Sequence, residues 1–251
     1  MMTLHLGDAR DINVRDAALI VTDFPYELTS GGKSDDPRAM SGGWMKDYDN
    51  KGKVVIADIS WADGMALMFE ALAPVAHAYV FCNNRHLQEA QNAATHAGFY
   101  IHNVLVWNKR TATANRWYMK NCEFVLFLGK GPAFKIGNCS SMACVEMFWP
   151  DETIHPNEKP WPLLQRYIRN SSEAGATVFD PFMGSGSTGV AAAKLGRDFI
   201  GIELEQRWFD IAKERIEKAE DEFQKLGGQA PYAGAGRAAH EQLDLEGLQR
   251  S

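Results

Sequence analysis

The chain has 251 residues, of which 45% are hydrophobic and 23% are charged, and its formal net charge is −6. This composition is ordinary for one globular domain with a full core. No run approaches 18 consecutive apolar residues, and the N-terminus lacks the basic start and the length of a secretion signal, so we expect a cytoplasmic protein without a membrane partner.

The four cysteines, Cys82, Cys122, Cys139 and Cys144, form no C-x-x-C pair and have no histidines at zinc spacing. We therefore expect reduced structural thiols and no metal site.

The negative charge is unevenly distributed along the chain. Residues 203–251 carry a net charge of −4, whereas residues 108–138 hold six basic side chains against Glu123 alone. A local basic stripe can bind a phosphate backbone even on an acidic protein, because screening confines the interaction to about 8–10 Å. A solvated surface is the other interpretation of the same stripe.

In chain order, the hydrophobic pattern predicts strands that alternate with helices. The expected strands are 4–6, 18–21, 78–81, 100–107, 123–128, 177–180 and 199–202. The expected helices are 61–73, 87–97, 162–170, 187–195 and 205–226. This alternation predicts an α/β fold with a mostly parallel sheet and helices on both faces.

Three stretches show no clear period. Residues 28–53 are rich in glycine and predict a mobile loop, and residues 131–154 predict a small recognition segment. Residues 227–251 predict a flexible tail, which leaves residues 1–226 as the catalytic domain.

Residues 177–189 form the most informative stretch. An apolar strand ends at Asp180, a turn with Gly184 and Gly186 follows, and a helix comes next. The glycines let a ligand approach the backbone amides, and the helix start offers unpaired N–H groups. Glu203 ends the next strand, 19 residues after Gly184, where nucleotide-binding βαβ units hold ribose hydroxyls. We therefore expect an adenosine compound at this turn.

A second motif, Asp23-Phe24-Pro25-Tyr26, follows the strand at 18–21. The carboxyl ends of strands are where open α/β sheets bind ligands. The two motifs are therefore expected to share one cleft.

Four motifs together carry a resemblance to a known family. Asp23–Tyr26, Trp107–Lys109, His155–Pro160 and Asp180–Gly186 occur in the order that resembles the beta group of DNA amino-methyltransferases. In these circularly permuted enzymes the catalytic motif precedes the cofactor motif. The likeness covers about residues 4–218 and implies a Rossmann-like S-adenosylmethionine-dependent methyltransferase fold.

The resemblance also implies which residues hold the cofactor, S-adenosyl-L-methionine. Glu203 would hold the ribose, Asp8 would face the adenine amino group, and Lys159 and Pro160 would close the site; the last two also suit a plain helix start. The methionine and ribose side would be lined by Asp180, Phe182, Gly184, Ser185, Gly186 and Thr188.

The catalytic motif is expected to act on an exocyclic amine, whose lone pair is delocalised into the ring. A carboxylate and a backbone carbonyl that accept its two N–H groups favour a pyramidal nitrogen, and Asp23 and the Phe24 carbonyl can supply these acceptors. Pro25 stiffens the loop. Tyr26 offers a face on which a flipped base can stack, worth about 1–3 kcal/mol. Methyl transfer would then be direct, within a fixed geometry.

This chain departs from the family in the second motif position, where proline is usual and Phe24 stands. The carbonyl is available from either residue, but the rigidity of the loop and the shape of the base pocket can change. Phe24 could form a wall of that pocket or mark relaxed activity.

The first motif residue bears on the choice of base. Aspartate there resembles the adenine-N6 enzymes more than the cytosine-N4 enzymes, which often carry serine. Methylation at cytosine C5 requires a cysteine that follows proline, and the sequence has none.

Double-stranded DNA is the expected partner. The candidates for phosphate contacts are Lys109, Arg110, Arg116 and Lys120. The short recognition segment predicts a short or relaxed target sequence. A homodimer and a restriction enzyme partner are compatible with this family and leave no mark in the sequence.

Three other functions compete with this prediction. An RNA or protein amino-methyltransferase shares the catalytic motif, and a degenerate binding module would account for Phe24. A nicotinamide oxidoreductase shares the glycine turn and Glu203 but leaves Asp23 without a role.

Overall fold

The computed structural model describes residues 1–25, 59–113, 118, 120–147 and 158–228, with only the backbone described at 110–113. The loop predicted at 28–53 lies outside these residues, as does the predicted tail from 229 onward.

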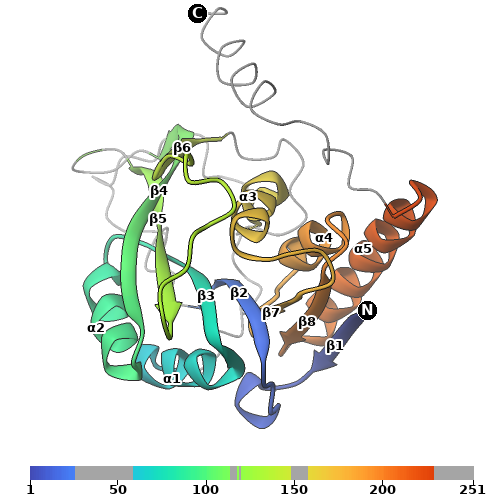
Figure 1. The fold of residues 1–251 in the computed structure, drawn as a ribbon, viewed down its shortest axis with the longest axis horizontal. Helices are drawn as coiled ribbons and strands as arrows, with labels where there is room; N and C mark the ends of the chain where they lie inside the picture. The colour runs from blue at the N-terminus through green and yellow to red at the C-terminus, as the bar shows by residue number, and fades with distance from the viewer. Residues whose placement is uncertain (26–58, 114–117, 119, 148–157, 229–251) are drawn as a thin grey trace, which may run out of the picture.

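A sheet forms the middle layer of the described structure, in the order β1-β8-β7-β2-β3-β5-β4-β6 (Figure 1). Its strands are β1 (Met2–Leu6), β2 (Ala17–Asp23), β3 (Leu72–Cys82), β4 (Tyr100–Thr113), β5 (Lys120–Lys130), β6 (Cys144–Glu146), β7 (Thr177–Asp180) and β8 (Asp198–Glu203). β5 runs antiparallel to β3 and β4, and the other neighbouring strands run parallel. The predicted mostly parallel sheet is confirmed.

Helices cover both faces of this sheet, as predicted (Figure 1). They are η1 (Ala9–Asp11), α1 (Trp61–Ala71), α2 (Leu87–Ala97), α3 (Trp161–Ser171), α4 (Ser187–Ala193) and α5 (Gln206–Lys225). β3 shows how the core is divided, because successive side chains of a strand point to opposite faces. Ala78 and Val80 pack in the cluster beneath α1 and α2, whereas Tyr79 and Phe81 pack in the cluster beneath α3, α4 and α5.

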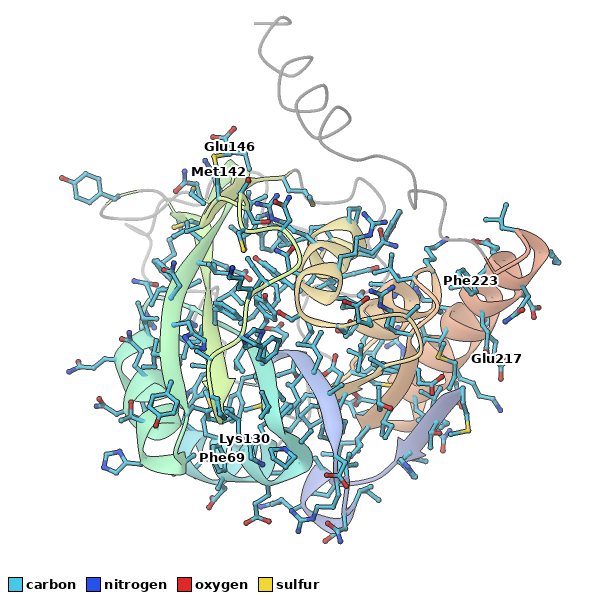
Figure 2. The ribbon with its side chains drawn as sticks, in the orientation of Figure 1. Phe69, Lys130, Met142, Glu146, Glu217 and Phe223 are labelled. Carbon is cyan, nitrogen blue, oxygen red and sulfur yellow. The ribbon has the colours of Figure 1, made fainter. Side chains whose placement is uncertain are left out.

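The end of α1 differs from its prediction. The helix stops at Ala71 instead of residue 73, and β3 begins at once with Leu72, which pairs with Ala17. Lys130 donates from Nζ to the carbonyls of Phe69 and Leu72, each at 2.6 Å, so a lysine of β5 satisfies carbonyls left open at this helix end (Figure 2).

The sequence pattern does not predict β6. It lies in the stretch for which no regular structure was expected, and it pairs with β4 in parallel. A strand of three residues is too short to show a period of two.

None of the helices in the described ranges has the length and apolar character needed to cross a membrane.

Candidate active site

The site lies where the chain changes direction across the sheet. β2 and β7 are parallel neighbours; from β7 the chain continues through α4 to β8, and from β2 it continues through α1 to β3 on the other side. Ligands of open α/β sheets bind at such a switch point, beyond the carboxyl ends of the strands. A cavity of about 180 Å³ occupies this position.

Most of the residues selected from the sequence line this cavity. They are Asp8, Asp23, Phe24, Pro25, Lys159, Asp180, Phe182, Gly184, Ser185, Thr188 and Glu203. Pro160 and Gly186 lie next to lining residues but not on the wall. Tyr26 lies outside the described residues.

The glycine turn is held by carboxylates on either side of it. Asp180 accepts a hydrogen bond from the Phe182 amide at 3.1 Å. Glu203 accepts from the Gly184 amide at 2.9 Å and from the Glu205 amide at 2.8 Å. Both carboxylates therefore shape the turn itself.

The two glycines of the turn differ in their surroundings. Both have positive φ, 52° at Gly184 and 82° at Gly186, which favours glycine. A Cβ at Gly186 would lie 2.9 Å from Ala212 Cβ, so this glycine allows α4 to pack against α5. A Cβ at Gly184 would meet nothing within 4 Å, so the backbone there faces open space beside the cavity.

Asp180 connects the two motifs. Thr22 Oγ1 donates to Asp180 Oδ1 at 2.6 Å, which joins the ends of β2 and β7. Burial raises the pKa of Asp180 to about 6, although hydrogen bonds from Thr22, Thr188 and the Phe182 amide oppose the rise.

Asp8 is another acid that lines the cavity. Arg10 pairs with it at 2.6 Å, and this hydrogen bond lowers the pKa of Asp8. The Gly7 amide donates to the Glu203 carbonyl at 2.9 Å, which brings the ends of β1 and β8 together. Asp8 is therefore an ionised hydrogen-bond acceptor beside the cavity.

Only one oxygen of the Asp23 carboxylate has a hydrogen-bond partner among the described residues. Lys159 Nζ donates to its Oδ2 at 2.5 Å. Its Oδ1 is buried and has no hydrogen-bond partner among the described residues. Burial raises the pKa of Asp23, and the charge of Lys159 offsets this only in part.

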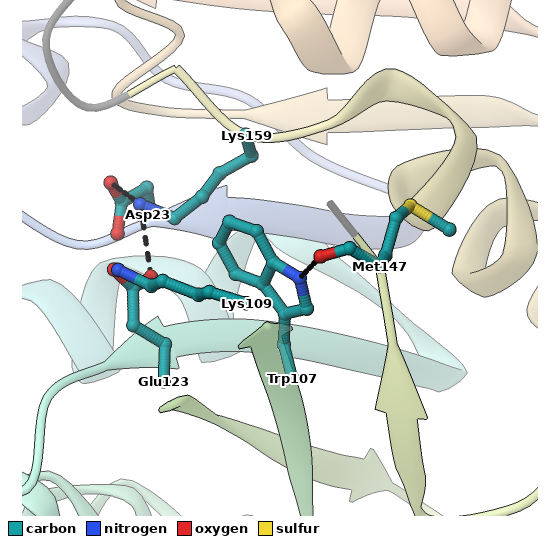
Figure 3. Close-up of polar contacts among 6 residues, drawn as sticks. All are labelled: Asp23, Trp107, Lys109, Glu123, Met147 and Lys159. Atoms are coloured by element: carbon teal, nitrogen blue, oxygen red, sulfur yellow. Dashed lines mark hydrogen bonds and ion pairs between the residues drawn. The ribbon is translucent and has the colours of Figure 1, made fainter. Parts of the chain in front are cut away.

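The contacts of Asp23 continue into a chain of charges (Figure 3). Lys159 Nζ also lies 3.3 Å from Glu123 Oε2, an ion-pair contact that does not meet hydrogen-bond geometry. Lys109 donates to the other oxygen of Glu123. Burial opposes ionisation of Glu123, but the two ammonium groups outweigh it and hold its pKa below the ordinary value.

Glu123 was missed as a site residue. It is the one acid in the basic stripe and stands directly before an apolar run, which is the signal that could have identified it. Lys109, which is expected to contact phosphate, donates to Glu123, and 22% of its side chain is exposed. Lys120 is exposed, whereas Arg116 and the Arg110 side chain lie outside the described structure.

Phe24 directs its ring into the core. It stacks on Trp61 with 3.9 Å between ring centroids and meets Phe182 edge-on at 5.3 Å. The residue is 2% exposed, and α1 makes room for it with Gly64. The ring thus forms a wall beneath the cavity, shared between the two motifs.

The segment before α3 is fixed by a second ion pair. Glu158 pairs with Arg215 of α5, and Arg215 Nη1 donates to the Ser185 carbonyl at 2.7 Å. These contacts fix Glu158, the residue before Lys159, beside the glycine turn.

Comparisons with known proteins identify the family of this chain. A family model described as DNA methylase matches residues 17–214. The chain is 30% identical over 234 residues to the Type II methyltransferase M2.DpnII of Streptococcus pneumoniae, covering 81% of this chain and 83% of the relative. It is 28% identical to M2.LlaDCHI of Lactococcus lactis subsp. cremoris, covering 80% and 82%.

Solved structures share the fold. M1.HpyAVI in complex with SAM superimposes with a TM-score of 0.64 at 24% identity, covering 86% of this chain and all of that one. The cytosine-N4-specific PvuII DNA methyltransferase gives 0.64 at 14% identity, covering 91% and 93%. The match to the family model and the sequence relatives establish the family: the chain is a DNA amino-methyltransferase of the N6/N4 family, whose methyl donor is S-adenosyl-L-methionine.

Proposed function

We propose that this chain methylates the N6 amino group of adenine in double-stranded DNA, with Asp23 as the residue that receives the amine. The observation that carries the proposal is the buried Oδ1 of Asp23, which has no hydrogen-bond partner in the described part of the chain and lies at the cavity. A buried acceptor of this kind is costly unless a ligand satisfies it.

The residues around the turn fit the methyl donor. When bound, S-adenosyl-L-methionine supplies an electrophilic methyl group. The open space beside Gly184 admits a ligand close to the backbone, and Glu203 and Asp8 offer acceptors for ribose hydroxyls and the adenine amine. The other residues proposed for this side are Lys159, Pro160, Asp180, Phe182, Ser185, Gly186 and Thr188.

Asp23 acts on the acceptor by hydrogen bonding. In its ionised form, Oδ1 can accept one N–H of the exocyclic amine, and the Phe24 carbonyl can accept the other. Withdrawing both N–H groups into hydrogen bonds favours a pyramidal nitrogen with a freed lone pair. A base can reach a cavity at the sheet edge only after leaving the duplex, so we infer base flipping, with Tyr26 as the stacking surface.

Cytosine N4 is the second candidate, because it presents the same two N–H donors. The aspartate at the first motif position supports adenine.

We also propose a short or relaxed target sequence. Methylation mapping that finds a single site of six or more base pairs would contradict this proposal.

Transfer of tritiated methyl groups from S-adenosyl-L-methionine to DNA, RNA and protein tests the proposal. We expect incorporation into DNA by the wild type and its loss in Asp23→Ala. Nucleoside analysis of the product should give N6-methyladenine; N4-methylcytosine would instead support the second candidate. Incorporation into RNA or protein but not DNA, or full activity of Asp23→Ala, would refute the assignment.

A further inference from the structure

We propose that Glu123 is a positioning residue for methyl transfer: through Lys159 it fixes the Asp23 carboxylate so that Oδ2 is occupied and Oδ1 is left for the substrate amine. The inference rests on the proposed role of Asp23.

The four charged groups come from separate parts of the fold and alternate in sign: Lys109 of β4, Glu123 of β5, Lys159 before α3 and Asp23 of β2 (Figure 3). Lys159 and Glu123 are the most enclosed, with 6% and 12% of their side chains exposed, and Asp23 is 26% exposed. β3 separates β2 from β5 in the sheet, so Lys159 bridges the end of this strand.

Glu123 restrains the position of the Lys159 ammonium group. A lysine has a long, flexible side chain and a point charge without a fixed direction. Lys159 Nζ lies between two carboxylate oxygens, 2.5 Å from Asp23 Oδ2 and 3.3 Å from Glu123 Oε2, and Lys109 holds Glu123 from its other side. The ammonium group is therefore restrained, and with it the rotation of the Asp23 carboxylate.

The charges of Glu123 and Lys159 act on Asp23 in opposite senses. Among the described residues, the charged or titratable groups that face Asp23 are Lys159, Glu123 and Lys109, together with Cys82 of β3 and Asp180 of β7. The Glu123 charge raises the pKa of Asp23 and the Lys159 charge lowers it. Removing one or the other must shift the Asp23 titration in opposite directions.

The experiment compares Glu123→Gln with Lys159→Gln. We expect the pKa of Asp23, followed by NMR of carboxyl-labelled protein without donor or DNA and identified by its absence in Asp23→Ala, to fall in Glu123→Gln and rise in Lys159→Gln. Because Asp23 must be ionised to accept the amine, the acidic limb of the kcat profile should move to lower pH in the first variant and to higher pH in the second.

The double variant Lys109→Gln/Glu123→Gln separates anchoring from charge and covers a failure of Glu123→Gln to fold. It removes one positive and one negative group, so the pKa of Asp23 should fall less than in Glu123→Gln. We expect kcat to fall at least roughly tenfold, since a misplacement of about 1 Å can cost about 100-fold. Glu222→Gln, which breaks the surface pair with Lys194, is the matched control and should leave kcat unchanged.

A double variant that keeps kcat within about twofold of wild type, while Asp23→Ala is inactive, would overturn the positioning role and leave the proposed function standing. Equal pKa values of Asp23 in the single variants and wild type would also overturn it. Full activity of Asp23→Ala would instead refute the proposed function.

Discussion

At the scale of single residues, Phe24 shows how a departure from the usual motif is accommodated. Its ring stacks on Trp61 in the core, and Gly64 of α1 leaves the space that the ring fills. The ring also meets Phe182, so the Asp23–Tyr26 motif and the glycine turn share one apolar contact. The aromatic residue therefore ties the Asp23 loop to α1, where the ring of proline would not reach as far.

This packing predicts the effect of Gly64→Ala. A Cβ at residue 64 would lie 2.2 Å from Phe24 Cε2, and the ring cannot easily move because Trp61 and Phe182 enclose it. In an open helix this change would stabilise the protein by about 1 kcal/mol. Here we expect a loss of about 1–3 kcal/mol from overpacking, measured by urea unfolding.

The compensating variant is Gly64→Ala/Phe24→Leu, in which the smaller side chain makes room for the methyl group. It should recover part of the lost stability. If Gly64→Ala alone unfolds at the same urea concentration as wild type or a higher one, the packing argument is wrong.

At the scale of elements, the antiparallel pair β4 and β5 carries two kinds of basic residue. Their register runs from Tyr100 opposite Gly129 to Thr113 opposite Lys120. Lys109 is engaged by Glu123, whereas the Lys120 side chain is exposed. We expect phosphate contacts at this end of the pair, from Arg110, Arg116 and Lys120.

DNA binding of a variant with Arg110, Arg116 and Lys120 changed to alanine tests this expectation. Log K falls with log salt, and each lost phosphate contact makes this slope shallower by about 0.9. The magnitude of the slope should therefore decrease by roughly 2–3. Titrations at several salt concentrations measure it. Alanine at Lys213, Lys218 and Lys225 of α5 removes the same charge and should leave the slope unchanged; an equal fall in both variants would point to net charge alone.

At the scale of the whole molecule, the site is assembled from two distant parts of the chain. β2 brings Asp23, and β7 and β8 bring the glycine turn and Glu203, with the Thr22 to Asp180 hydrogen bond between them. The acceptor side and the donor side should therefore be separable by mutation.

Stabilisation by the product S-adenosyl-L-homocysteine tests this separation. At about 100 times its Kd, a ligand stabilises the native state by about 2.7 kcal/mol. We expect Asp23→Ala to keep the increase in Tm and Glu203→Ala to lose most of it, each relative to its own ligand-free Tm. Glu222→Ala serves as the control. A full increase in Glu203→Ala would remove Glu203 from the donor site.

The sequence by itself determined the family, the alternation of strands and helices, and the turn at Gly184, because each depends on residues close together in the chain or on the order of motifs. The end of α1 was placed two residues late, since Lys130 completes it from a distant strand.

Only the tertiary structure decided the direction of β5, the place of the Phe24 ring and the meeting of Lys109, Glu123 and Lys159 at Asp23. Side chains 36 and 136 residues apart are in contact there because segments distant in sequence come together at the ends of the strands. Periodicity records which face of an element is apolar, but it carries no information about which strands lie together, and so the charges around Asp23 could not be read from it.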